Sequence, residues 1–119
     1  MSDRKVLIRE YKEARRPMGV FRVRNTINGK AFVGSSVDLP SILNRHLAQL
    51  RLHAHTNRAL QQDWDDLGAD AFVFEVVDTL SPSEDATYDP RGDLRTLEAL
   101  WLERLSPYGD QGYNARPKG

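Results

Sequence analysis

The chain has 119 residues, of which 39% are hydrophobic and 29% are charged, and these values are ordinary for one soluble domain with a modest core. It contains no cysteine, which excludes disulfides, thiolate catalysis and zinc–thiolate sites. No apolar run reaches the roughly 18 residues that a membrane span needs, and the N-terminus lacks a signal-peptide core. We therefore expect a cytoplasmic protein with no membrane partner.

The net charge of zero conceals two halves of opposite sign. Residues 1–60 hold 12 Lys and Arg against 4 Asp and Glu, and the remaining residues hold 5 against 13, so the halves carry +8 and −8. A cationic region of this kind attracts polyanions such as nucleic acids even on a neutral molecule. The alternative is that the two halves attract each other or form separate solvated surfaces.

The chain begins with a predicted basic helix over residues 2–15, which Pro17 ends. We accordingly divide the chain into this helix, residues 1–17, and a folded domain, residues 18–119. Residues 19–25 alternate apolar and polar side chains and predict a strand. Asn28-Gly29 then indicates a type I′ turn, and residues 31–35 form the returning strand of a hairpin.

Two helices and a third strand are expected next. Asp38 is a suitable N-cap, with Pro40 in the first turn, for a helix over residues 39–52. Thr56 is the expected cap of a second helix that ends at Gly68.

Residues 71–78 carry apolar side chains on both faces, which predicts a strand buried between two layers. A loop over residues 81–92 leads to a last helix, from an Asp93 cap to Leu105. The fold class is therefore α/β, more exactly α+β, with a small three-stranded antiparallel or mixed sheet flanked by helices.

Two polar residues interrupt apolar helix faces. At about 100° per residue, Glu98 falls between Leu102 and Leu105, and His46 falls among leucine and isoleucine side chains. A carboxylate in such a place needs a partner, a metal or a proton. The alternatives are that His46 is a hydrogen-bonded core histidine and that Glu98 lies at the edge of its stripe and points to solvent.

The hairpin carries the triplets Gly19-Val20-Phe21 and Phe32-Val33-Gly34, and the tail after the last helix contains Gly112-Tyr113-Asn114. With Glu98 three residues before Trp101, this order and spacing resemble the GIY-YIG nuclease family from residue 18 to 114. The resemblance implies hydrolysis of a DNA phosphodiester with one divalent metal, Mg²⁺ or Mn²⁺, as cofactor. Glu98 matches the metal-binding glutamate of the family.

The chain departs from the family at its catalytic positions. Phe21 and Phe32 stand where the family has tyrosines, and Ile42 stands where it has an arginine, so none of the three keeps the family's chemistry. His46 matches a family histidine that tunes the hairpin tyrosine, and Arg45, almost one turn beyond Ile42, is the neighbouring cation. We expect five positions to line one shallow face: Phe21, Phe32, Ile42, His46 and Glu98.

Arg22, Arg24, Lys30 and Asn114 are the candidate contacts to nucleic acid on the hairpin and the tail. Three functions remain open. The first is DNA binding with cleavage weakened or lost, and the second is an active endonuclease that uses Glu98 with His46 and Arg45. The third is a protein-interaction module that uses the basic helix and the acidic half. Salt-sensitive DNA binding separates the first two from the third, and metal-dependent cleavage separates the second from the first.

Overall fold

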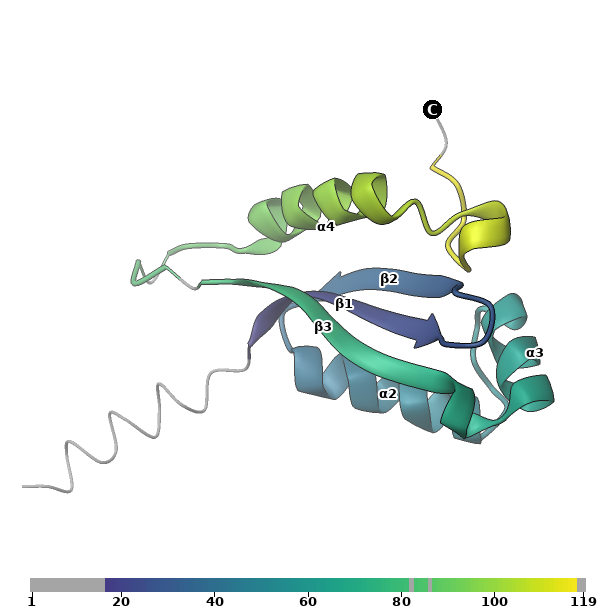
Figure 1. The fold of residues 1–119 in the computed structure, drawn as a ribbon. Coiled ribbons are helices and arrows are strands. Elements are labelled where there is room, and N and C mark those ends of the chain that lie inside the picture. Colours follow the sequence, from purple (N-terminus) through teal and green to yellow (C-terminus); the bar gives the residue numbers. More distant parts are fainter. Residues whose placement is uncertain (1–16, 82, 86, 118–119) are drawn as a thin grey trace, which may run out of the picture.

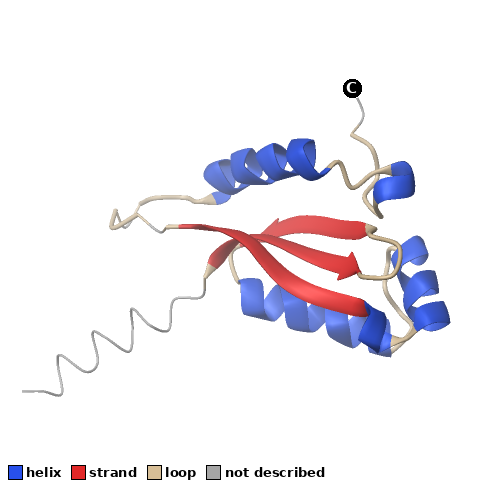
Figure 2. Ribbon diagram, in the orientation of Figure 1, coloured by secondary structure: helices blue, strands red, loops and turns tan. Residues whose placement is uncertain are grey.

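The computed structural model describes residues 17–81, 83–85 and 87–117. The predicted basic helix at residues 2–15 lies outside the described residues, so that helix and the division of the chain at residue 17 stay predictions. The described residues form a three-stranded antiparallel sheet with helices on both faces (Figure 1 and Figure 2). This architecture confirms the predicted α+β fold class and shows that the sheet is antiparallel rather than mixed.

The sheet has the order β2-β1-β3, so the first strand is the central one. Strand β1 (Met18–Asn25) pairs with β2 (Ala31–Ser36) on one side and with β3 (Phe72–Leu80) on the other. Because both of its edges are paired, β1 is the most deeply buried strand, and the side chains of Val20 and Val23 have no exposed surface.

The hairpin loop is wider than the predicted type I′ turn. The amide of Asn25 donates to the carbonyl oxygen of Lys30 at 2.8 Å, which leaves residues 26–29 in the loop. Gly29 adopts a φ of +79°, but Asn28 does not have the positive φ that a type I′ turn also requires there. The side-chain oxygen of Asn25 accepts two loop amides and stabilises the wider loop. The turn prediction is therefore wrong, although both strands are confirmed.

Helix α2 (Leu39–Arg51) begins as predicted. The carboxylate of Asp38 accepts the amide of Ser41 at 3.2 Å and so satisfies one free donor of the first turn. Pro40 occupies the first turn, where its missing N–H costs nothing.

Helix α3 (Arg58–Leu67) is capped by Asn57 and not by Thr56 as predicted. The side-chain oxygen of Asn57 accepts the amide of Leu60 at 3.0 Å. Asparagine is among the strongest N-cap residues, which is the physical reason for the shift by one position. Gly68 ends the helix with a φ of +87°, as predicted for its C-terminal glycine.

Strand β3 follows a short 3₁₀ turn, η1 (Ala69–Ala71), and forms an edge of the sheet. Its Val73 and Val76 are 37% and 49% exposed, so the prediction of a strand buried on both faces is wrong. Apolar residues on both faces do not distinguish an edge strand from a central one, because only the pairing partners decide that. The sheet as a whole does lie between helical layers (Figure 1).

Helix α4 (Arg91–Leu105) begins two residues before the predicted Asp93 cap. It covers one face of the sheet, where its apolar side chains pack on Val20, Ala31 and Val33. Helices α2 and α3 cover the opposite face and form a second apolar cluster around Val23. No helix in the described part of the chain is both long and apolar enough to cross a membrane.

Candidate functional site

The two hairpin triplets meet across the β1–β2 ladder. Phe21 and Gly34 are paired in register, and the ring of Phe21 lies over the glycine. A methyl group added to Gly34 would come within 2.7 Å of the Phe21 Cζ atom, which is closer than packed carbon atoms approach. Glycine in the second triplet therefore makes room for the aromatic ring of the first, and Phe21 is only 3% exposed.

Phe21, Phe32, His46 and His55 form one group of rings in tilted and edge-on contact, which we call the aromatic–histidine cluster. The ring centroid of His46 lies 5.2 Å from those of both phenylalanines. The ring of His55 lies edge-on to Phe32 at 5.7 Å, and Nδ1 of His46 is 2.8 Å from Nε2 of His55. Three of the predicted catalytic positions are thus brought together, and a fourth residue, His55, joins them.

Both histidines of the cluster are held in the neutral form. Burial, followed by the neighbouring His55 and Arg45, lowers the pKa of His46 from 6.5 to about 4. Burial lowers the pKa of His55 as well. Each imidazole therefore enters any chemistry at neutral pH without a charge.

Ile42 and Arg45 both lie on α2 but in different surroundings. Ile42 is half-buried, consistent with its place on the apolar stripe, whereas Arg45 is exposed. The charge of Arg45 is close enough to His46 to depress the pKa of the imidazole. Arg45 is therefore the cation of α2 that lies beside the aromatic–histidine cluster.

Glu98 approaches the sheet from α4, on the face opposite to α2 (Figure 1). One of its oxygens, Oε1, accepts the hydroxyl of Ser35 at 2.7 Å, and the residue is half-buried. Successive side chains of a strand point to opposite faces, so Ser35 points away from the face that Phe32 and Gly34 occupy. The expectation that Glu98 shares one face with Phe21 and His46 is therefore not met.

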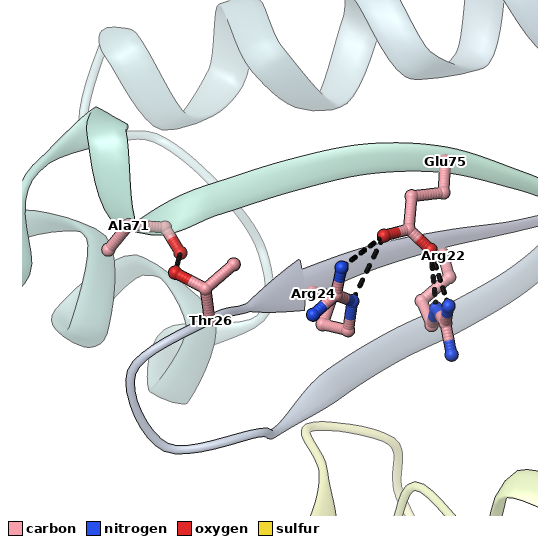
Figure 3. Close-up of polar contacts among 5 residues, drawn as sticks. All are labelled: Arg22, Arg24, Thr26, Ala71 and Glu75. Carbon is pink, nitrogen blue, oxygen red and sulfur yellow. Dashed lines mark hydrogen bonds and ion pairs between the residues drawn. The ribbon is translucent and has the colours of Figure 1, made fainter.

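Arg22 and Arg24 point to the same side of β1 and bind one carboxylate, Glu75 on β3 (Figure 3). The Nε atom of Arg22 donates to Oε2 at 3.0 Å, and Nη2 of Arg24 donates to Oε1 at 2.7 Å. Burial raises the pKa of Glu75, but the two guanidinium groups outweigh it and hold that pKa below its usual value. The three side chains form a cluster of net charge +1 in which each oxygen of the carboxylate is occupied.

The other two predicted nucleic-acid contacts lie beside the C-terminal tail. Asn114 pairs with the outer edge of β2, where its amide nitrogen donates to the carbonyl oxygen of Val33 at 2.8 Å and its oxygen accepts the amide of Val33 at 2.9 Å. Lys30 lies 5.9 Å from the centroid of the Tyr113 ring. Asn114 therefore helps the tail to cover the outer edge of β2, where the amide of Tyr113 also donates to the carbonyl oxygen of Ala31 at 2.9 Å. This is a structural use of Asn114.

Sequence reasoning missed a polar network around Tyr113. Its hydroxyl donates to Oδ2 of Asp63 at 2.6 Å and accepts the side-chain amide of Asn25 at 3.1 Å. Burial, together with the Asp63 carboxylate, raises the pKa of Tyr113 to about 12. The network joins the tail, the hairpin and α3. The one sequence signal was a polar residue, Asn25, at the end of the predicted first strand, and its burial is seen only in the structure.

The comparisons with known proteins agree on the architecture. The catalytic domain of the homing endonuclease I-TevI superposes with a TM-score of 0.68 at 23% identity, over 84% of this chain and 99% of that one. A point mutant of the same catalytic domain gives a TM-score of 0.67 at 22% identity, over 82% and 92%. This chain has the GIY-YIG fold. The resemblance predicted from the hairpin triplets is thereby confirmed at the level of the fold.

One curated relative has a sequence match, the intron-associated endonuclease 1 of Enterobacteria phage T4. It is 25% identical over 96 residues, which make up 81% of this chain. The matched part is 36% of the phage protein, so this chain spans about a third of that relative. No protein-family model matches the chain.

Proposed function

We propose that this chain is a nucleic-acid-binding domain of the GIY-YIG fold in which metal-dependent cleavage of phosphodiesters is weakened or lost. The observation that carries the proposal is the aromatic–histidine cluster. Phe21 and Phe32 pack there against His46 and His55, and neither phenylalanine ring has an oxygen that can take a proton from water. A missing general base typically costs ~10²–10⁴ in rate.

DNA is the partner that the relatives favour, because both the phage protein and the I-TevI domain are named as endonucleases. Cationic side chains on the described residues add support. Arg45 is exposed beside the cluster, and the Arg22–Glu75–Arg24 group keeps a charge of +1. The DNA affinity that a few cationic side chains provide through phosphate contacts is modest and falls as the salt concentration rises.

A divalent metal fits the chain only in a limited way. The described residues contain no group of three or more His, Cys, Asp and Glu side chains that can enclose an ion. Glu98 supplies one carboxylate, and its Oε1 already accepts a hydrogen bond from Ser35. A hard cation held by one carboxylate and otherwise by water and phosphate suits this arrangement, since Mg²⁺ keeps most of its water. Such an ion supplies charge stabilisation at a phosphate.

The second candidate is an endonuclease with rearranged residues, and the exposed Arg45 next to His46 is the observation in its favour. In this reading Glu98 would hold the metal, Arg45 would bind the phosphate and His46 would take the proton, although Glu98 reaches β2 from the face opposite to His46. The third candidate, a protein-interaction module, rests only on the opposite net charges of the two halves of the sequence.

We expect the natural chain to bind duplex and single-stranded DNA weakly at low salt, with no sequence preference. Each phosphate that it neutralises contributes about −0.9 to the slope of log K against log salt on duplex DNA. Arg45→Gln is expected to reduce the magnitude of that slope, because the exposed guanidinium is lost without disturbing an ion pair. Fluorescence anisotropy at several salt concentrations measures both quantities.

Arg95→Gln is the matched control for this experiment, since Arg95 is also an exposed helical arginine but lies on α4, across the sheet. Its slope is expected to equal that of the natural chain. A titration in which no DNA binds at the lowest salt contradicts the proposed function and favours the protein-interaction reading.

We also expect no nicking of supercoiled plasmid above background by the natural chain, in either Mg²⁺ or Mn²⁺. One absent charge-stabilising donor typically costs ~10²–10³ in rate, and the base is absent as well. The triple change Phe21→Tyr, Phe32→Tyr and Ile42→Arg is expected to recover some nicking, as followed on agarose gels. Circular dichroism of the triple variant checks that the new charge on α2 leaves the domain folded.

Addition of Glu98→Ala to the triple variant is expected to abolish the recovered nicking. Glu98 contacts the edge strand β2, which also carries position 32, so its carboxylate would hold a metal ion at that edge. The same change in the natural chain is expected to alter nothing. Robust nicking by the natural chain that Glu98→Ala removes would replace the proposed function with the second candidate.

A further inference from the structure

His55 and His46 are joined in a series of hydrogen bonds that starts at the backbone amide of Asn57, a group that can only donate. The N–H of Asn57 lies 3.0 Å from Nδ1 of His55, so Nδ1 accepts and carries no proton. A neutral imidazole has one N–H, which in His55 must therefore be on Nε2. That nitrogen lies 2.8 Å from Nδ1 of His46, so Nδ1 of His46 accepts in turn. The proton of His46 then resides on Nε2.

Asn57, whose amide starts this series of hydrogen bonds, is held in place by its side chain. Asn57 caps α3 with its side-chain oxygen, and its side-chain nitrogen donates to the carbonyl oxygen of Tyr113 at 2.7 Å. The two imidazole rings are enclosed by Phe32 and by each other, with centroid distances of 5.0 to 5.7 Å. Neither ring can turn over without breaking these contacts, so the direction of both hydrogen bonds is fixed by the fold.

The Nε2 atom of His46 has no hydrogen-bond partner among residues 17–81, 83–85 and 87–117. Arg45, the preceding residue on α2, is exposed, and its charge acts on the His46 imidazole. A neutral N–H together with a guanidinium suits a phosphate oxygen, which accepts from both. A base requires the reverse, an unprotonated nitrogen that faces the water.

We propose that His55 is a positioning residue that fixes the proton of His46 on Nε2, so that His46 donates a hydrogen bond to a phosphate oxygen of bound nucleic acid and does not act as a base. The phosphate contact rests on the proposed function, whereas the position of the proton does not. Phe21 has no hydroxyl group that His46 could orient. His46 instead pairs with His55.

The positions of the protons are measurable by NMR in the full chain labelled with ¹⁵N. Long-range ¹H–¹⁵N correlation near neutral pH distinguishes protonated from unprotonated ring nitrogens. We expect a protonated Nε2 and an unprotonated Nδ1 for both His46 and His55. A proton on Nδ1 of His46 in the natural chain overturns the proposal, and this result needs no variant to fold.

Variants of His55 test its positioning role directly. In His55→Gln, the new side-chain amide is able to donate to Nδ1 of His46, so the single tautomer of His46 is expected to persist. In His55→Leu, which has no donor, we expect His46 to lose its single tautomer and show averaged nitrogen shifts. His53→Gln is the control, because His53 is exposed and bonded to Asp65. A tautomer of His46 that is unchanged in folded His55→Leu overturns the positioning role.

A titration of the same sample with a short duplex DNA tests the phosphate contact. We expect the Nε2 proton of His46 to shift on binding and the Nδ1 signal to keep its unprotonated character. DNA that binds without moving the Nε2 signal overturns the contact. DNA that fails to bind at all overturns the proposed function and the contact together, whereas the tautomer of the free protein still decides the role of His55.

Discussion

Gly19→Ala is expected to destabilise the domain by about 3 kcal/mol or more and to weaken the pairing of β1 with β3. The added methyl group would lie 2.0 Å from the carbonyl oxygen of Asp78 and 2.7 Å from the Cα of Thr79. Both atoms belong to the backbone of β3, so no side chain can rotate to make room. Gly19 also has a φ of +157°, which residues with a side chain rarely adopt. Urea unfolding followed by circular dichroism measures the change.

Gly92→Ala is the matched control, since a methyl group there meets nothing within 4 Å and the residue lies in α4. Alanine is a better helix former than glycine, so a stabilisation of up to about 1 kcal/mol is expected. If Gly19→Ala unfolds at the same urea concentration as the natural chain, the close approach of β1 to β3 at this residue is wrong.

The glycines of the two triplets show what sequence patterns predict well. Gly19 permits the approach of the β3 backbone, and Gly34 makes room for the ring of Phe21. Both requirements depend on the fold and not on catalysis, so the triplets persist although both tyrosine positions hold phenylalanine. This is why the hairpin and the GIY-YIG fold were predictable from the sequence even where the catalytic residues had changed.

The position of Glu98 was less predictable. A helical wheel places its side chain on the apolar stripe of α4, and Leu97 and Trp101 do pack against the sheet. The wheel does not reveal which face of the sheet the helix covers, because that depends on the path of the chain after β3. Glu98 therefore meets Ser35 from one side, while His46 meets Phe32 from the other.

The shared partner of Arg22 and Arg24 also could not be predicted from the sequence. Strand alternation places Arg22 and Arg24 on one side of β1, but their partner depends on the register with β3. That register sets Arg22 opposite Glu75 and contains an irregularity between Val20 and Phe21. Side-chain alternation alone gives no means of locating such a shift, so the pairing of both guanidinium groups with one carboxylate appears only in the folded chain.

The domain is expected to lose stability as the pH falls from about 7 to about 5, because of the neutral histidines of the aromatic–histidine cluster. Burial, with His55 and Arg45 nearby, lowers the pKa of His46 from 6.5 to about 4 in the folded state. Between these two values the unfolded chain binds a proton that the folded chain does not, so protonation favours unfolding. Well above pH 6.5 neither state is protonated at His46, so His46 no longer makes the stability depend on pH.

The expected loss from His46 is about 1–2 kcal/mol between pH 7 and pH 5, as measured by urea unfolding at a series of pH values. His55 adds to the loss in the same direction, since its pKa is also lowered. The carboxylates with lowered pKa, such as Glu75, lose their contribution only at lower pH, as they become protonated, so this window isolates the histidines. His46→Gln is expected to flatten the pH dependence, because glutamine does not titrate yet can still accept a hydrogen bond from His55.

His53→Gln serves as the control, since the His53 side chain is 68% exposed and lies outside the cluster. Its pH dependence is expected to retain the loss of stability that His46 causes. The decisive comparison is therefore between His46→Gln and His53→Gln. Only His46→Gln is expected to change the slope of the free energy of unfolding against pH. Equal slopes in the natural chain and in His46→Gln would show that His46 titrates normally, and the neutral hydrogen-bonded pair with His55 would then be wrong.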